Sequence, residues 1–273
     1  PVAISVLLPA LYIPIIAMLM GLIFRGVAVE FRERAPTRRQ RHLWDAGFLG
    51  GSVLAAFCQG ALLGAVMQGI KIAPGPFGGR FGGYPFSWLS WFSVYTGIAL
   101  VFGYGLLGAT WLIWRTEGDL QNRMRRWAAI LCVVQIAFMV GVSFWTPFLN
   151  HHYMHRWFTW PAAIVTTLAP FGVLGAVALF YFFLWKRKDN PKYDMMPFLC
   201  AGALFVIAYA GVGFSLYPII LPPSLTIWNA SSPPMTEEFI LIGDAIFIPI
   251  LLGYNTFAWW IFRGKARDEP FGD

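Results

Sequence analysis

The sequence predicts an all-α polytopic membrane protein, and composition, run length and the placement of basic residues each support this fold class. Of the 273 residues, 58% are hydrophobic and only 12% are charged, against about 25% charged in ordinary soluble domains. A soluble fold could not bury that much apolar surface, whereas a lipid bilayer accepts it. No second domain is indicated, so residues 1–273 are interpreted as a single helical membrane domain.

Seven apolar runs are long enough to cross roughly 30 Å of hydrocarbon at about 1.5 Å per residue. Because lipid offers the backbone no hydrogen-bonding partner, each run is expected to be an α-helix. The runs cover, in chain order, residues of about 2–24, 47–70, 86–114, 128–149, 160–185, 196–216 and 237–262.

Basic residues fill alternate connections between these runs and predict the orientation of the chain. The connections after the first, third and fifth runs, together with the segment after the last run, hold 17 of the 20 lysines and arginines. Only Lys71, Arg80 and Arg156 lie on the other side. The positive-inside rule therefore predicts a periplasmic N-terminus and a cytoplasmic C-terminus. The same bias accounts for the net charge of +7, so no nucleic-acid partner is inferred.

The segment between the last two runs, residues 216–232, resembles neither a membrane span nor a solvated linker. Pro218, Pro222 and Pro223 remove backbone donors and prevent a continuous helix. The apolar residues around Trp228 are too many for an exposed loop. We therefore expect the segment to lie folded against other protein at the membrane surface. Asn229 begins a glycosylation-type triplet, but the apolar, proline-bounded setting favours a chance match.

Acidic residues in or beside the runs are candidates for function, because a charge in lipid is costly. Asp244 lies about two turns into the last run, where it must pair, become protonated or face water. Alternatively, it lies at interfacial depth near Glu237 and Glu238. Asp45 lies where the second run meets a basic connection, and two interpretations remain open for it. It caps the helix N-terminus, or it takes up protons on the cytoplasmic side.

Arg25, Glu30 and Arg32 follow the first run within one or two helical turns of each other. Opposite charges at this spacing predict a cluster of ion pairs just inside the membrane. The second run holds Gln59 and Gln68 and the fourth holds Gln135, and such amides usually hydrogen-bond neighbouring helices.

The four histidines do not predict a metal or haem site. His151 and His155 are spaced i, i+4, which on a helix could face one metal ion. No carboxylate or cysteine accompanies them, and histidine among aromatic residues is typical of the membrane interface. His42 and His152 also lie outside the middle of the runs, where an axial haem ligand would be expected. We therefore expect no metal site and no haem bound by this chain alone.

The chain begins at Pro1, with no initiator methionine, and enters an apolar run at once. The charged region and cleavage site of a signal peptide are missing, so the sequence is interpreted as a fragment. Seven runs also suggest retinal proteins and receptors, but the last run lacks the lysine that a retinal protein needs. The acidic-Arg-aromatic triplet of a receptor is also missing at the end of the third run, where the sequence reads Trp114-Arg-Thr-Glu117. A secondary transporter or a structural membrane scaffold remains an alternative, although mid-run positions are almost purely apolar, unlike a transporter site.

Five motifs, in order along the whole chain, carry a resemblance to a known family. They are GLIFRGVAVEFR at 21–32, WDAG at 44–47 with FCQG to QG at 57–69, YGLLGATWLIWRTEG at 104–118, YPIILPPSLTIWNASS at 217–232, and PILLGY leading to FRGK at 249–265. Together they resemble subunit II of the cytochrome bd-type quinol oxidases of bacteria. Members of that family begin with a further membrane segment carrying a Trp-Asp-Gly-Asn-type motif, so the resemblance implies that roughly the first fifth is missing here.

The resemblance implies an enzyme subunit that is not catalytic alone, in the inner (cytoplasmic) membrane of a bacterium. Subunit I, its expected partner, carries the haems b and d and reduces dioxygen to water with electrons from quinol. The chain itself is expected to be haem-free, to stabilise subunit I and to help bring cytoplasmic protons to the oxygen site. In some members this subunit also holds a structural quinone. Membrane lipids and a small single-span accessory subunit are further expected partners.

The resemblance also assigns roles to single residues. Asp45 lies in a matching motif and is the first candidate for proton handling, with Arg25, Glu30 and Arg32 holding that region together. Glu117 is expected to line the same cytoplasmic surface. Asp244 matches no family motif, so its candidacy rests on burial cost alone. Five residues of the segment 216–232 are expected to form a structural outer cap: Pro218, Pro222, Pro223, Trp228 and Asn229.

Overall fold

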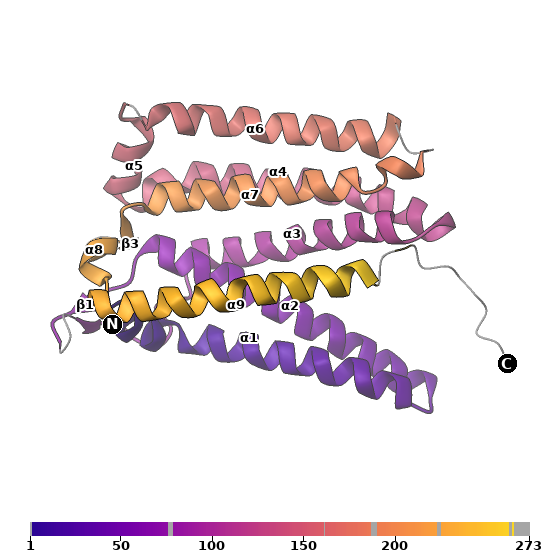
Figure 1. Cartoon of the computed structure of the whole chain (residues 1–273), viewed down its shortest axis with the longest axis horizontal. Helices are drawn as coiled ribbons and strands as arrows, with labels where there is room; N and C mark the ends of the chain where they lie inside the picture. The colour runs from indigo at the N-terminus through magenta and orange to yellow at the C-terminus, as the bar shows by residue number, and fades with distance from the viewer. Residues whose placement is uncertain are drawn as a thin grey trace.

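The apolar runs of the sequence form long α-helices that lie side by side in the computed structural model (Figure 1). The structure describes residues 2–75, 79–160, 162–186, 190–222, 225–261 and 264. The long helices are α1 (Val2–Arg34), α2 (Arg38–Gln68), α3 (Trp91–Arg115), α4 (Gly118–Leu149), α6 (Ala163–Tyr181), α7 (Met196–Leu216) and α9 (Pro234–Ile261).

The short elements all lie in connections at the ends of these helices. They are β1 (Ile72–Ala73) paired antiparallel with β2 (Arg80–Phe81), α5 (His151–Phe158), the π-helical η2 (Phe182–Lys186), the 3-10 turn η3 (Pro191–Tyr193), β3 (Ile219–Leu221) paired antiparallel with β4 (Leu225–Thr226), and α8 (Ile227–Ala230). The predicted all-α class is therefore confirmed.

Six helices of the described chain are long and apolar enough to cross a membrane: residues 3–34, 38–68, 91–115, 118–149, 163–186 and 191–216. The prediction of a multi-pass membrane protein is thus confirmed. The seventh predicted run forms α9, which is not among the six. The count of seven spans and the orientation of the termini stay predictions.

Helices α1 and α2 both extend beyond the apolar runs, and this corrects one interpretation of Asp45. Residues 38–44 are mostly good helix formers, so α2 begins at Arg38, about two turns before Asp45. The helix is capped by Thr37, whose side-chain oxygen accepts a hydrogen bond from the amide of Gln40 at 3.3 Å. The interpretation of Asp45 as the cap is therefore wrong.

Small residues let α1, α2 and α3 approach closely. A Cβ atom on Gly51 would lie 2.5 Å from the carbonyl oxygen of Gly21 on α1. On the side facing α3, a Cβ atom on Gly60 would lie 2.4 Å from the carbonyl oxygen of Thr96, and one on Gly64 only 2.1 Å from the Thr96 hydroxyl oxygen. Lipid-embedded helices associate through such close packing, because hydrocarbon tails are as apolar as the side chains themselves.

Helices α3, α4, α6 and α7 surround a shared core. Leu106, Cys132 and Phe180 are completely buried there, and Leu204 is nearly so. A smaller core lies at the other end of the molecule, where Leu221 of β3 packs with residues of α1, α2 and β4. Of the segment 216–232, Leu221, Pro222 and Leu225 thus pack against protein as predicted, whereas Ile220, Ile227 and Trp228 are 40–65% exposed.

A buried ion pair ties α4 to the turn before α7. An Nη atom of Arg125 lies 2.7 Å from Oδ1 of Asp194, with both side chains no more than 5% exposed. Gln121 donates a hydrogen bond to the other carboxylate oxygen at 3.1 Å and one to the carbonyl of Ile113 at 2.8 Å. Arg125 also donates to the carbonyl of Leu184, in the π-helical η2. The cluster therefore joins α3, α4, η2 and the turn before α7.

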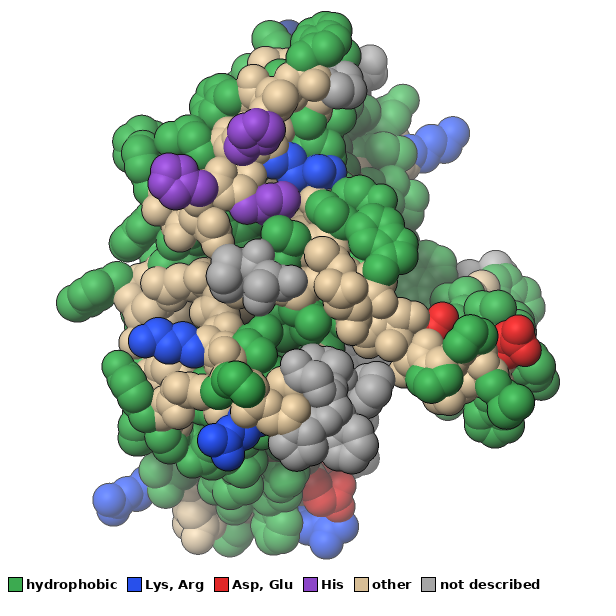
Figure 2. Space-filling view, turned by 90° about the vertical axis from the view of Figure 1, so that its left-hand side faces the viewer, with side chains coloured by type: hydrophobic (Ala, Val, Ile, Leu, Met, Phe, Trp, Pro, Cys, Tyr) green, Lys and Arg blue, Asp and Glu red, His purple; other side chains and the backbone are tan. Residues whose placement is uncertain are grey.

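Helix α9 stands apart from the other helices, and Figure 2 shows it end-on as a separate lobe. None of its described residues is buried. Its C-terminal end makes contacts with α3: the ring centroids of Trp259 and Trp114 are 5.3 Å apart, and the guanidinium of Arg115 lies 5.5 Å from the Trp259 ring. The rest of α9 presents large apolar side chains outward.

We predict that Gly60→Ala lowers the free energy of unfolding by about 1–3 kcal/mol, because the new methyl group meets α3 backbone that cannot yield without separating the helices. Gly108→Ala is the matched control, since no heavy atom lies within 4 Å of the added Cβ and alanine favours the helix. Thermal unfolding of the detergent-solubilised protein measures both variants. Equal melting temperatures would contradict the close packing.

We predict that Asp194→Asn destabilises the protein by about 3–5 kcal/mol, because it leaves the buried Arg125 charge without its counter-ion. Glu30→Gln is the control: it breaks a pair with Arg34 whose side chains are 61% and 74% exposed, and such pairs contribute at most about 1 kcal/mol. The same thermal assay compares them, and a larger loss in Glu30→Gln than in Asp194→Asn would refute this ranking.

Candidate functional site

The site that includes Asp45 lies at the end of the α1–α2 hairpin, where the chain is rich in arginine. Nε of Arg32 donates a hydrogen bond to Oδ1 of Asp45, joining α1 to α2. The Phe31 and Trp44 rings stack beside this pair at 5.3 Å between centroids. The Asp45 side chain is 45% exposed. A carboxylate held in this way can exchange a proton with water while its position is fixed by the two helices.

The expected single cluster of Arg25, Glu30 and Arg32 does not form. Arg25 and Arg32 are seven residues apart and face α2 together, whereas Glu30 points about 140° away from Arg25 around α1. Glu30 instead accepts a hydrogen bond from Arg34, one turn further along α1. The guanidinium of Arg25 lies 5.6 Å from the ring centroid of Phe48, and no carboxylate of a described residue lies within 4.0 Å of it.

The other two acidic candidates, Glu117 and Asp244, belong to other parts of the chain than the α1–α2 hairpin. Glu117 precedes the first residue of α4, at the same end of the molecule, but its side chain does not cap that helix. Asp244 is exposed on α9, about three turns after the first residue of that helix. No described basic residue lies within 4.0 Å of the Asp244 carboxylate.

The pair of Arg125 and Asp194 was missed by sequence reasoning. Nothing in the sequence distinguishes Arg125 from the other basic residues of its connection, or Asp194 from the charged residues just before it. The available signal was an acidic residue placed directly before an apolar run, where a long charged side chain from another connection could reach it. The pairing itself spans 69 residues of sequence, so neither residue alone indicates the other.

Three of the four histidines, His151, His152 and His155, lie on α5 at the opposite end of the molecule, and Figure 2 shows histidines gathered there, whereas His42 lies in the first turns of α2. Asn150 caps α5 by accepting a hydrogen bond from the amide of His152 at 3.2 Å. Burial is the main cause that lowers the pKa of His152 and favours its neutral form. Within the described residues, no group of three or more histidine, cysteine or acidic residues could hold a metal ion.

Helix α5 instead makes packing contacts. Tyr153 is completely buried, and its hydroxyl donates to the carbonyl of Met67 at 2.7 Å, while burial raises the pKa of this hydroxyl. Arg156 donates from Nε to the carbonyl of Phe214 at 2.7 Å. These bonds fasten the connection between α4 and α6 to the ends of α2 and α7.

The segment 216–232 likewise makes structural contacts. Pro222 is buried, and its carbonyl oxygen would lie 2.7 Å from a Cβ atom on Gly69. Pro218 accepts a hydrogen bond from the amide of Ile227 at 2.9 Å. The Trp228 ring meets the Tyr217 ring edge-on at 6.2 Å, and the amide of Asn229 donates to the Thr226 hydroxyl at 3.3 Å. Pro223 lies outside the described residues.

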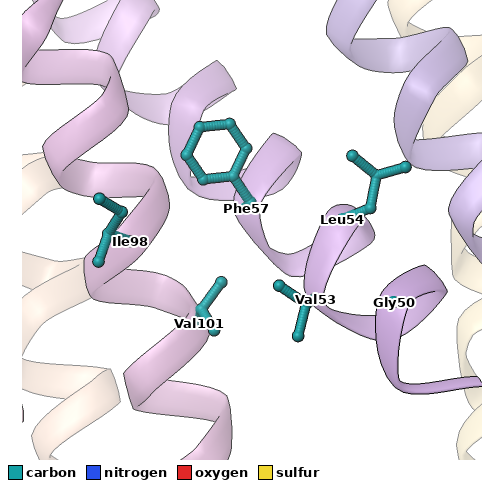
Figure 3. A pocket seen from close by; sticks show the side chains of 6 residues that line it. All are labelled: Gly50, Val53, Leu54, Phe57, Ile98 and Val101. Atoms are coloured by element: carbon teal, nitrogen blue, oxygen red, sulfur yellow. The ribbon is translucent and has the colours of Figure 1, made fainter. Parts of the chain in front are cut away.

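An apolar groove and a more polar cavity open on the described surface. A groove of about 330 Å³ between α2 and α3 is apolar, and Figure 3 shows that its lining side chains offer no hydrogen-bond donor or acceptor: Gly50, Val53, Leu54, Phe57, Ile98 and Val101. The second cavity, of about 430 Å³, lies at the arginine-rich end and is lined by Asp119, Asn122, Arg123, Arg125, Arg126 and Trp185.

Polar contacts within the membrane-spanning helices are few. The hydroxyl of Tyr104 on α3 donates to Oε1 of Gln59 on α2 at 2.9 Å, so Gln59 bonds a neighbouring helix as predicted. Oε1 of Gln135 on α4 is buried without a hydrogen-bond partner among the described residues. The described ion pairs between acidic and basic side chains all lie towards the arginine-rich end.

Comparison with known proteins agrees with the resemblance found in the motifs. Residues 1–262 match the family model of cytochrome bd terminal oxidase subunit II. Cytochrome bd ubiquinol oxidase subunit 2 of Bacillus subtilis is 27% identical over 277 residues, which cover 97% of this chain and 77% of the relative. Cytochrome bd-I ubiquinol oxidase subunit 2 of Escherichia coli K12 is 23% identical, over 94% of this chain and 75% of the relative. A probable cytochrome oxidase subunit 2 of Haemophilus influenzae is 22% identical, over 100% of this chain and 78% of the relative.

The family model extends over all the long helices and over both ends of the molecule described above. Its match does not depend on one motif, and the fold has the membrane helices that such a subunit requires. This chain belongs to the cytochrome bd terminal oxidase subunit II family.

Proposed function

We propose that this chain is the haem-free subunit II of a bacterial quinol:oxygen oxidoreductase in the cytoplasmic membrane. Family membership supports the proposal, together with relatives that are named as second subunits of cytochrome bd ubiquinol oxidases. In this proposal the chain stabilises subunit I and helps to deliver protons for the reduction of dioxygen to water. It does not catalyse the reaction alone.

The proposed haem-free state is supported by where the histidines lie. His42 falls in the first turns of α2, and the other three belong to α5, so no histidine occupies the middle of a spanning helix. An axial haem ligand within the bilayer would be expected there. We therefore propose that the haems b and d are bound by subunit I.

The proposed stabilising role is supported by the apolar faces of the helices. Large side chains of α9 such as Phe239, Leu241 and Phe247 are 65–78% exposed, and the helix buries none of its described residues. Exposed apolar faces suit both lipid and a helical partner, and a subunit I of similar helical build could cover α9 on the side away from α3. The expectation of a small single-span accessory subunit as a further partner is supported only by the resemblance.

The proposed proton role rests on one observation, the pair of Arg32 and Asp45 at the arginine-rich end. The positive-inside rule assigns this end to the cytoplasm, from which the protons for oxygen reduction are taken in this proposal. Asp45 accepts a proton from water, and Arg32 fixes the position of the carboxylate. Glu30 and Glu117 lie at the same end and are secondary candidates. Asp244 takes part in proton transfer in this proposal only if a partner subunit covers α9.

The proposal that this chain binds a structural quinone is supported only by the resemblance. The groove between α2 and α3 is apolar, so an isoprenoid tail could lie in it, but its lining side chains give a quinone head group nothing to bind (Figure 3). Quinol as a substrate is assigned to subunit I for the same reason.

We predict that Asp45→Asn in the assembled complex slows oxygen reduction by about 10²-fold, the lower part of the range for a lost proton-transfer group. The amide keeps the shape and still accepts a hydrogen bond from Arg32, so assembly and haem content should be unchanged. Glu33→Gln is the control, since Glu33 is an exposed carboxylate on α1 beside the site. Oxygen consumption with quinol measures all three proteins, and wild-type turnover in Asp45→Asn would rule out this role.

We predict that affinity-tagged chain, expressed in its own host, co-purifies with a haem-bearing membrane subunit and with quinol oxidase activity. The absorbance spectrum of the purified sample reports the haems, and peptide mass spectrometry identifies the partner. Purification of the chain alone, together with solute uptake after reconstitution, would favour a transporter and defeat the proposal.

A further inference from the structure

The cavity at the arginine-rich end is built where the first turns of α4 meet the π-helical end of α6. Its walls are held in place by the buried pair of Arg125 and Asp194, and Arg125 also donates to the carbonyl of Leu184 at 3.2 Å. The cavity is therefore shaped before any ligand arrives, and a preformed site loses less entropy on binding. We propose that it binds the phosphodiester headgroup of an anionic membrane phospholipid.

The charge of the cavity favours an anion. Arg123 and Arg126 are exposed, and no carboxylate of a described residue lies within 4.0 Å of either guanidinium. Arg125 is matched by Asp194, and Asp119 in the wall cancels one further charge. A surplus of one positive charge remains, which matches the single negative charge of a phosphodiester.

The same face of α4 supplies a surface for the acyl chains. Arg123 and Arg126 are followed at i, i+3, i+4 and i+7 spacing by Trp127 and Ile130, so all four lie along one side of the helix. Trp127 is 56% exposed, Ile130 54% and Val133 61%. This apolar stripe leads away from the arginines into the membrane-spanning part of α4.

Trp185 marks the depth of the site. It lines the cavity from η2 and is 49% exposed, at the end of a spanning helix. Indole rings prefer the level of the lipid headgroups, and basic pockets between membrane helices are known to bind such headgroups. A free phosphate ion would use the arginines but not the stripe or the indole ring. The geometry therefore favours a lipid over a soluble anion.

The test measures lipid binding to the purified complex by native mass spectrometry. Phosphatidylglycerol, phosphatidylcholine and inorganic phosphate are titrated separately onto delipidated protein. Wild-type complex should bind phosphatidylglycerol in preference to phosphatidylcholine. The double variant Arg123→Gln/Arg126→Gln should weaken the phosphatidylglycerol binding by about thirtyfold, since each arginine near an anionic headgroup contributes about fivefold.

Arg38→Gln/Arg39→Gln is the matched control, because it removes two exposed arginines at the same end but outside the cavity, and it should bind like wild type. A photoactivatable phosphatidylglycerol adds a readout that does not depend on the variants, and its crosslinks should map to residues 119–133 and 182–186. Equal binding of the two lipids, unchanged binding in the Arg123/Arg126 double variant, or full competition by millimolar inorganic phosphate would each overturn the proposal. Oxidase activity is not the readout, so failure of this site leaves the proton role of Asp45 separate.

Discussion

A polar group placed among membrane helices has no water to bind, so it is costly to leave that group without a partner within the protein. Thr96 and Thr110 on α3 satisfy this constraint locally, by donating to carbonyl oxygens one turn earlier. Arg125 and Asp194 satisfy it across the fold, with Gln121 and two backbone carbonyls completing the cluster. The strands and short helices of the described chain lie at the helix ends for the same reason, since only there can irregular backbone reach water or polar side chains.

Close packing of small residues between α1 and α2 also determines the geometry of the Asp45 site. The antiparallel register that places Gly21 against Gly51 continues along α1 and α2 towards the end of the hairpin. It brings Arg25 over Phe48, then Phe31 onto Trp44, and finally Arg32 to Asp45. The position of the candidate carboxylate is therefore set in part by Gly51, about two turns from Asp45 on α2, and by Gly21, about three turns from Arg32 on α1, and a change in helix separation would move it.

The sequence was informative where the physics is local. Apolar runs and basic connections predict the helices and the arginine-rich end, because hydrophobicity and charge act residue by residue. The helix of α2 begins earlier than its apolar run, because Arg38 to Leu43 favour helix in water as well as in lipid. The pairing of Arg125 with Asp194 could not be predicted, since it depends on how α4 and α7 pack. The separation of α9 from the other helices could not be predicted either, because a helix that is apolar on all sides does not indicate which neighbour it packs against.

Charge balance separates the two arginine sites at the same end of the molecule. On the α1–α2 hairpin Arg32 is matched by Asp45 and Arg34 by Glu30, so these two arginines carry no unmatched charge for an anion. Around α4 the buried Arg125 is matched by Asp194, but Arg123 and Arg126 exceed the acidic residues beside them. A matched pair at the surface suits the proposed exchange of a proton, because protonation of the carboxylate changes the balance locally. An unmatched pair of arginines beside an apolar stripe suits a permanent anion that is anchored in the bilayer.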